Sequence, residues 1–339
     1  MLSKEYLIKQ EQCCGRGCLM CPYIPRHKQG SSKIMNQLGY ACINMHLSQQ
    51  KPKVYTGRSM IKRTFTEKGI NYASELGLQN TKDLFTIIKW NNENGFKFFR
   101  ITSNLFPWCS EYKLEDMPDH WEIAGILGEI GKYVDENNMR ITSHPGPFNV
   151  LTSPHEHVVQ NCIKDLSVHG EVFDMMGLSR TPYNKINIHI GGVYGDKVSA
   201  MERFCTNFHR LPNSVKSRLT VENDDKATMY SVVDLYEGVY KVIGIPIVFD
   251  YHHHRFNTGG LSEEDALEVA ISTWGDVVPV VHYSESRNIE QEDDKIRPQA
   301  HSDYVYDYID TYGNEVDIMV EAKAKELAVL KYKEVHGIL

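Results

Sequence analysis

The stretch GIPIVFDYHHHRF, residues 244–256, places a short apolar segment directly before one aspartate and three histidines. Its β-branched and aromatic residues follow a glycine and lead into polar side chains, which is typical of a buried strand. In a parallel barrel, the active site lies at the carboxyl ends of the strands. The stretch therefore predicts a buried strand that carries Asp250 and at least one histidine to such an end.

Seven further segments repeat this pattern of a β-rich run, a polar turn and a segment with helical periodicity. The eight strands are expected at residues 39–45, 96–102, 139–144, 185–192, 218–223, 246–251, 279–284 and 316–322. Thr81 and Ser262 are expected to open helices within 80–95 and 262–275, and residues 321–335 form another helical run. Eight strand–helix units predict an α/β fold, a closed (β/α)8 TIM-like barrel. A doubly wound open sheet is the alternative, but no glycine-rich dinucleotide turn follows the first strand.

Residues 1–38 lie outside this rhythm and are expected to form a short cysteine-rich N-terminal extension before the barrel domain at 39–339. Four of the eight cysteines crowd the segment CCGRGCLMCPY, residues 13–23. In a reducing compartment such a cluster indicates a metal site, so zinc is expected at Cys14, Cys18 and Cys21. An iron–sulfur site of the radical S-adenosylmethionine type and a metal-free lid are the alternatives.

The composition is that of a soluble globular chain, with 41% hydrophobic and 24% charged residues. The sequence shows no apolar run of membrane-spanning length and no signal-peptide core. We therefore expect an intracellular location in cytoplasm or nucleus, without secretion or a membrane partner. The net charge of −7, from 37 basic and 44 acidic residues, disfavours nucleic acid unless a local patch or bound cations reverse it. The sequence indicates no particular protein partner.

Six successive predicted strands each carry one potential metal ligand: His144, His189, Glu222, Asp250, His282 and Glu321. His301 follows in the loop after the seventh strand, and alternation beyond Asp250 leaves open whether His252 or His253 points inward. Burying unpaired carboxylates costs several kcal/mol, so a compensating cation is expected. This donor set suits roughly two or three divalent ions, with manganese expected and zinc or magnesium as alternatives.

Nine motifs occur in order along the chain: GYACIN, FFRITSNLFPW, SHPG, HIGGVYGDK, TVENDD, VFDYHHHRFN, VHYSES, RPQAHSDY and MVEAKAKE. Together they resemble the UV-damage endonuclease family, from about Gly39 to beyond Glu326. The resemblance implies a barrel related to the endonuclease IV type of abasic-site nuclease, with a multinuclear metal site. It selects His253, and it implies the ligands His144, His189, Glu222, Asp250, His253, His282, His301 and Glu321.

The resemblance also implies damaged double-stranded DNA as the partner, with a role for Tyr40 at the lesion. The basic loop KPKVYTGRSMIKRTF, residues 51–65, is expected to contact the DNA backbone. Family members often have a Gln–aromatic pair where this chain has Pro147 and Phe148, so only the stacking face is kept; some have a histidine at Asn104. The residues expected to contact DNA are Tyr40, Arg58, Lys62, Arg63, Asn104 and Phe148.

The expected function is that of a metal-dependent DNA-repair endonuclease. It would cut the phosphodiester bond immediately 5′ to UV photoproducts and other distorting lesions, by metal-activated water. Glu222 is expected to bridge two ions, and the expected catalytic residues are Glu222, Asp250, His282 and Glu321. His144 and His189 are placed at a second ion, and His253 and His301 at a third. The alternatives are an abasic-site endonuclease of the endonuclease IV type, a metal-dependent sugar isomerase or epimerase, and a non-enzymatic damage binder.

Overall fold

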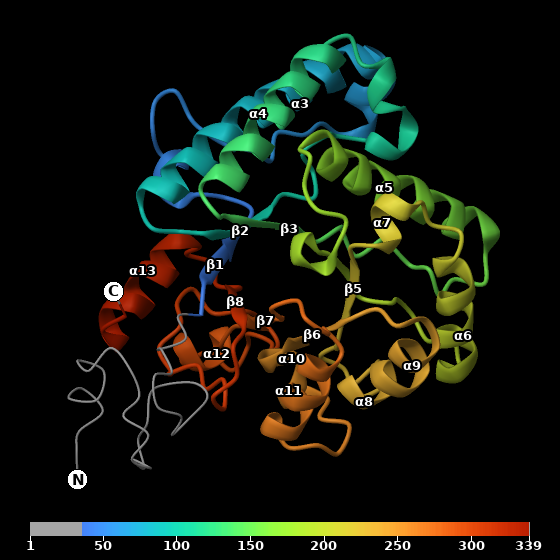
Figure 1. Ribbon diagram of the computed structural model, residues 1–339, viewed down its shortest axis with the longest axis vertical. Coiled ribbons are helices and arrows are strands. Elements are labelled where there is room, and N and C mark those ends of the chain that lie inside the picture. The colour runs from blue at the N-terminus through green and yellow to red at the C-terminus, as the bar shows by residue number, and fades with distance from the viewer. Residues whose placement is uncertain (1–35, 339) are drawn as a thin grey trace.

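The computed structural model describes residues 36–338, and within them eight parallel strands close into one barrel (Figure 1). The strands are β1 (Leu38–Ala41), β2 (Phe98–Ile101), β3 (Arg140–Ser143), β4 (Ile186–Ile188), β5 (Leu219–Glu222), β6 (Ile247–Asp250), β7 (Val280–Tyr283) and β8 (Asp317–Val320). Each strand pairs with its neighbours in sequence, and β1 pairs with β8 to close the ring. The predicted barrel and its eight strands are confirmed. Glu222, Asp250 and His282 lie within their strands, whereas His144, His189 and Glu321 directly follow theirs.

Helices lie outside the strands and connect them (Figure 1). The α-helices are α2 (Met45–Ser48), α3 (Lys62–Glu93), α4 (His120–Glu136), α5 (Glu156–Met175), α6 (Lys197–Phe208), α7 (Asn213–Lys216), α8 (Val232–Leu235), α9 (Lys241–Ile243), α10 (Tyr251–Phe256), α11 (Glu263–Ser272), α12 (Arg287–Glu290) and α13 (Glu326–His336). Short 3₁₀ helices are η1 (Cys109–Glu111), η2 (Leu114–Asp116) and η3 (Pro182–Asn184), and η4 (Tyr236–Tyr240) is a π-helix. Within residues 36–338, none of these helices is long and apolar enough to cross a membrane.

The three predicted helix positions have different outcomes. Ser262 caps α11 as predicted, because its hydroxyl accepts from the Asp265 backbone N–H at 3.1 Å. The predicted start at Thr81 is wrong: α3 begins at Lys62, and the Thr81 hydroxyl donates to a carbonyl one turn earlier. The C-terminal helix α13 begins at Glu326 rather than at residue 321, because Lys325 before it has φ 56° and ψ −125°.

Alternation along the strands decides what fills the barrel. Strand register pairs Asp250 with His282, and Val248 and Val280 lie one layer below them in β6 and β7. The apolar cluster that contains these two valines also includes Ala41, Phe98, Trp274 and Met319. The polar residues at the carboxyl ends therefore lie above an interior that is partly apolar.

The same alternation corrects the expectation for Tyr40. Tyr40 is fully buried in the hydrophobic cluster that contains Phe96 and Phe99, with which its ring makes edge contacts. Its hydroxyl donates to Asn91 at 2.5 Å and accepts from Asn44 at 2.9 Å. Tyr40 thus anchors β1 to α3, and it offers no surface to DNA. Cys14, Cys18 and Cys21 lie outside the described residues, so the expected zinc site stays a prediction.

Candidate metal centre

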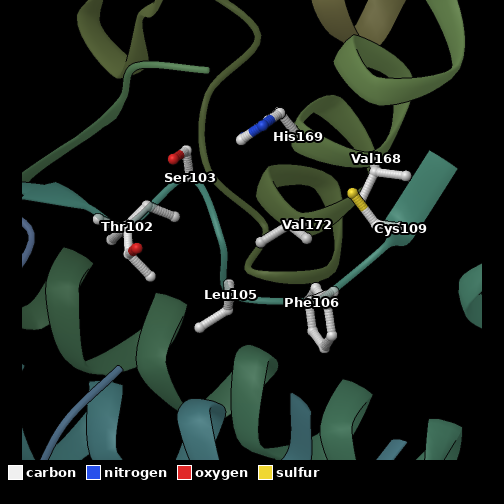
Figure 2. A pocket seen from close by; sticks show the side chains of 9 residues that line it. Thr102, Ser103, Leu105, Phe106, Cys109, Val168, His169 and Val172 are labelled. Atoms are coloured by element: carbon white, nitrogen blue, oxygen red, sulfur yellow. The ribbon is translucent and has the colours of Figure 1, made fainter. Parts of the chain in front are cut away.

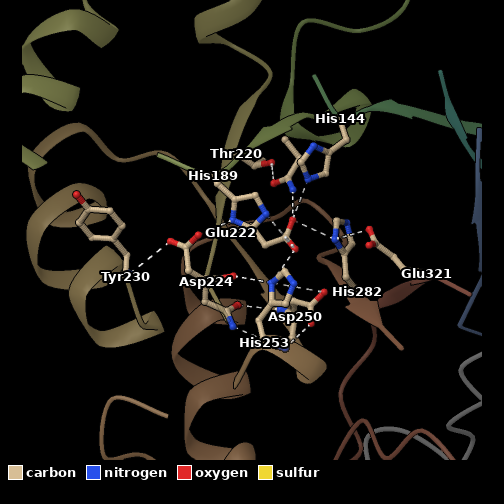
Figure 3. A network of polar contacts seen from close by, with 12 residues as sticks. His144, His189, Thr220, Glu222, Asp224, Tyr230, Asp250, His253, His282 and Glu321 are labelled. Carbon is tan, nitrogen blue, oxygen red and sulfur yellow. Dashed lines mark hydrogen bonds and ion pairs between the residues drawn. The ribbon is translucent and has the colours of Figure 1, made fainter. Parts of the chain in front are cut away.

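Seven of the eight predicted ligands come together at the carboxyl end of the barrel (Figure 3). Within residues 36–338 they form three groups whose ligand atoms lie within 4.8 Å of one another: His144, His189 and Glu222; Glu222, Asp250 and His253; and Asp250, His282 and Glu321. Glu222 belongs to the first two groups and Asp250 to the last two. The groups therefore form one connected centre rather than three separate sites.

The transition from β6 into α10 explains why His253, and not His252, joins the centre. The chain becomes helical directly after Asp250, whose Oδ1 caps the helix by accepting from the His253 N–H at 2.8 Å. Helical spacing brings the residue three positions later back over the cap. The His253 ring faces the Asn223 carbonyl through Nδ1 at 2.8 Å, which leaves Nε2 as the unprotonated nitrogen. His252 packs instead against Phe256.

Asp250 is buried close to two other carboxylates, Glu222 and Glu321. Its Oδ2 is buried and has no hydrogen-bond partner among the described residues. Burial, together with the charges of Glu222 and Glu321, raises the pKa of Asp250 to about 7. Burial alone would lower the pKa of His189, but Glu222 and Asp224 outweigh it and raise the value to about 10.

Bound divalent cations would stabilise Asp250 in two ways. They would neutralise the crowded carboxylates, and they would coordinate the Oδ2 oxygen that has no hydrogen-bond partner among the described residues. Imidazole nitrogens mixed with carboxylate oxygens are donors that suit manganese, zinc or iron. The residues present therefore fit a multinuclear metal centre.

His282 is oriented by a buried lysine that directly precedes β4, on the other side of the barrel from β7. Its Nδ1 lies 3.1 Å from both Glu222 Oε2 and Glu321 Oε1, and its Nε2 lies 3.1 Å from Lys185 Nζ. Burial lowers the pKa of His282 to about 4 and that of Lys185 to about 7. A neutral Lys185 amine can accept the Nε2 hydrogen, so the Nδ1 lone pair is free to bind a metal.

Comparison with known proteins shows the family to which the chain belongs. The family described as UV-endonuclease UvdE matches residues 36–338. The chain belongs to this family. The UV-damage endonuclease of Schizosaccharomyces pombe is 36% identical over 309 residues, which cover 87% of this chain and 50% of that protein. The putative UV-damage endonuclease of Acanthamoeba polyphaga mimivirus is 32% identical, covering 88% of this chain and 91% of that protein. The chain thus spans about half the length of the S. pombe relative.

Solved structures have the same fold as this chain. The protein in the crystal structure of SacUVDE is 32% identical in sequence and superposes with a TM-score of 0.76, covering 89% of this chain and 98% of that one. D-psicose 3-epimerase from Clostridium cellulolyticum H10 is 13% identical with a TM-score of 0.50. That second likeness shows the barrel alone.

The eighth predicted ligand, His301, lies beside the centre in this UvdE family member. Its Nδ1 is 2.9 Å from the Glu321 carbonyl and 3.9 Å from Glu321 Oε2, and its ring meets that of His253 edge-on. His301 belongs to none of the three groups within residues 36–338. His253 forms a group with Glu222 and Asp250, and the predicted pairing of His253 with His301 at a third ion stays a prediction. A ligand role for His301 stays a prediction.

Five side chains that support the ligands were not predicted from the sequence: Arg100, Lys185, Asn187, Thr220 and Asp224. Arg100 donates to Glu321, and Asn187 donates to Glu222 and accepts from Thr220. Lys185 and Asn187 precede His189 by four and two positions, so extending the two-residue alternation backwards from that ligand would have found them. Asp224 lies in a turn after β5, where no such period applies.

Asp224 fixes the orientation of His189, and we expect its replacement by asparagine to weaken metal binding about tenfold. Asp224 Oδ1 lies 3.1 Å from His189 Nδ1, and the loss of its charge removes the electrostatic attraction that holds the ring in this orientation. Titration with Mn²⁺ against a competing chelator measures the change. Asp225→Asn, one residue further along, is the matched control. Equal affinities of both variants would remove Asp224 from this role.

The residues expected to contact DNA lie in different environments. Arg58 is partly exposed, and its guanidinium donates to Asp83 at 2.6 Å and to the Lys53 carbonyl at 3.0 Å. Its charge is thus already paired within the protein, and a contact between Arg58 and DNA stays a prediction. Lys62 and Arg63 at the start of α3 are exposed.

Asn104 and Phe148 are exposed in the loops after β2 and β3, and 88% of the Phe148 side chain is accessible. Asn104, Phe148, Lys62 and Arg63 are therefore the predicted DNA contacts whose side chains are exposed to solvent.

A small pocket lies beside the metal centre, under the loop after β2 (Figure 2). Its walls are mainly apolar and come from β2, the following loop and α5: Ile101, Thr102, Ser103, Leu105, Phe106, Cys109, Val168, His169 and Val172. His169 faces Ser143 through Nδ1 at 2.9 Å. The pocket lining contains none of the three carboxylates Glu222, Asp250 and Glu321.

Proposed function

We propose that this protein is a metal-dependent DNA-repair endonuclease that cuts the phosphodiester bond immediately 5′ to UV photoproducts and other distorting lesions. One observation carries the proposal: three linked groups of histidines and carboxylates meet at the carboxyl rim of a barrel in the UvdE family. Relatives named UV-damage endonuclease support damaged double-stranded DNA as the substrate. The fit of the donors supports roughly two or three divalent ions, with manganese as the first choice.

The chain's own residues hold the reacting groups in place. Bound divalent ions would supply water of lowered pKa and neutralise charge on the phosphate and the leaving oxygen. Glu222 belongs to two ligand groups and would therefore be a ligand common to both, if each group holds an ion. Arg100 pairs with Glu321 and keeps that carboxylate charged in a buried position. Asp250, His282 and Glu321 complete the catalytic set.

The loops around the centre supply the surface for DNA. Phe148 presents a nearly fully accessible ring beside the ligands of the first group, where it can stack on an unpaired base. A damaged pair is less costly to unstack than an intact one, so distortion itself favours the lesion. Lys62 and Arg63 can contact backbone phosphates because both are exposed at the start of α3, where Arg63 also pairs with Glu67 at 3.6 Å.

Nick mapping tests this function. With Mn²⁺, we expect incision of a duplex at the phosphate 5′ to a photoproduct, no incision of the undamaged duplex, and loss of activity with EDTA. A third duplex with an abasic site distinguishes the endonuclease IV-like alternative: exclusive cleavage there would reassign the substrate. Absence of incision of all three duplexes with Mn²⁺, Zn²⁺ or Mg²⁺ would contradict an endonuclease function.

A further inference from the structure

Lys325 has a backbone conformation that is unusual for a residue with a side chain. It stands between β8 and α13 with φ 56° and ψ −125°. These angles resemble the first central position of a type II′ turn, which glycine strongly prefers. Strained positions of this kind cluster at sites that bind or react, so a lysine held here calls for a functional reason.

Among residues 36–338, the Lys325 ammonium has no hydrogen-bond or ion-pair partner, and its side chain is half-buried. Burial lowers the pKa of Lys325, and its nearest charged neighbours include Arg100 and Glu321. Arg100 is already paired with Glu321, so the charge of Lys325 is the one left uncompensated.

The course of the chain places this charge at the edge of the metal centre. Lys325 lies five residues beyond the end of β8 and four residues after Glu321, at the carboxyl end of the barrel. The charges of Cys42, Arg100 and Glu321 act on it there. Glu321 belongs to the third ligand group, so Lys325 lies at that end of the connected centre. A half-buried cation beside bound divalent ions is stabilised by an anion that can reach both.

We propose that Lys325 binds a phosphate of the cleaved DNA strand beside the Glu321 end of the metal centre and thereby positions the substrate. The inference rests on the proposed function and adds a positioning residue to it. Lysine is suited to this task because it acts as a point charge toward phosphate. The substrate then provides the counter-charge that no side chain of residues 36–338 supplies, and the strained backbone keeps the ammonium at the rim.

The test compares incision of a photoproduct duplex by the full-length wild type and by Lys325→Met, Lys325→Arg and Lys132→Met. Enzyme is in excess, and the half-saturating enzyme concentration is measured over a range of salt concentrations. We expect Lys325→Met to raise that concentration about tenfold and to reduce the slope of log affinity against log salt by about 0.9, the value for one phosphate contact. Lys325→Arg should restore both quantities. Lys132, an exposed residue of α4 near the opposite end of the barrel, should be replaceable without effect.

Lys325→Gly separates a binding role from a structural one. Glycine accepts the positive φ, so this variant should unfold roughly 1–3 °C higher than wild type while it loses affinity like the methionine variant. Bound metal, measured by elemental analysis, should be unchanged in all variants.

Wild-type affinity and salt slope in both Lys325→Met and Lys325→Gly would overturn the assignment while leaving the endonuclease proposal intact. A loss of affinity accompanied by loss of metal would overturn it too. Absence of incision by the wild type would overturn both proposals.

Discussion

Replacing Glu222 by glutamine is expected to lower the incision rate at least about 10³-fold while the fold remains, because the centre loses several kcal/mol of metal-dependent stabilisation of the transition state. Glu222 is 1% exposed and is shared by two ligand groups. Its oxygens lie 3.1 Å from His282 Nδ1 and 3.3 Å from His144 Nε2. The amide keeps the volume but removes the charge, so two ions lose a common ligand.

Incision of the photoproduct duplex under single-turnover conditions, with elemental analysis of the same preparation, measures this change. Glu237→Gln is the matched control, since Glu237 is an exposed residue whose partner is Lys241 in the next turn. We expect that control to incise at the wild-type rate. A Glu222→Gln protein that keeps its ions and its rate would show that the three groups do not act as one centre.

The fold followed from the sequence because its signals repeat. Each strand has a short apolar run that ends in polar residues, and the same pattern occurs eight times before the chain ends. Parallel strands that are each followed by a crossover have few closed arrangements, so the count alone indicated the barrel. Helix starts were harder to predict: Thr81 has the residue type of a cap, but the chain before it is also helical and packs on the barrel.

The ligands were accessible to sequence reasoning because strand ends converge at one rim, whereas their partners depend on distances across the barrel. The position of His253 depended on where β6 ends and α10 begins, and alternation could not supply that boundary. Lys185 meets His282 across 97 residues of sequence. Only the closed ring brings these two side chains into contact.

Tyr40 and Arg58 show why residue type is a weak guide to a DNA contact. Both belong to the segment that leads from β1 into the basic loop, and both have side chains that suit nucleic acid. Tyr40 faces the helices because its neighbours Gly39 and Ala41 alternate to the other side of the strand. Arg58 is held by Asp83, which α3 presents from 25 residues further along the chain. Whether a surface cation is already paired with a carboxylate therefore depends on the tertiary structure.

Replacing Arg140 by methionine is expected to destabilise the protein by about 3–5 kcal/mol, because it leaves a buried charge without its partner. Arg140 is fully buried and donates to Asp317 Oδ2 at 2.8 Å and to the Val278 and Tyr183 carbonyls at 2.9 Å and 2.8 Å. Urea unfolding measures the loss, and Lys241→Met, which removes an exposed ion pair, should cost less than about 1 kcal/mol. If the unpaired Asp317 charge is the cause, adding Asp317→Asn to the methionine variant must recover a large part of the stability. A double variant as unstable as the single one would place the cost in the lost carbonyl contacts instead.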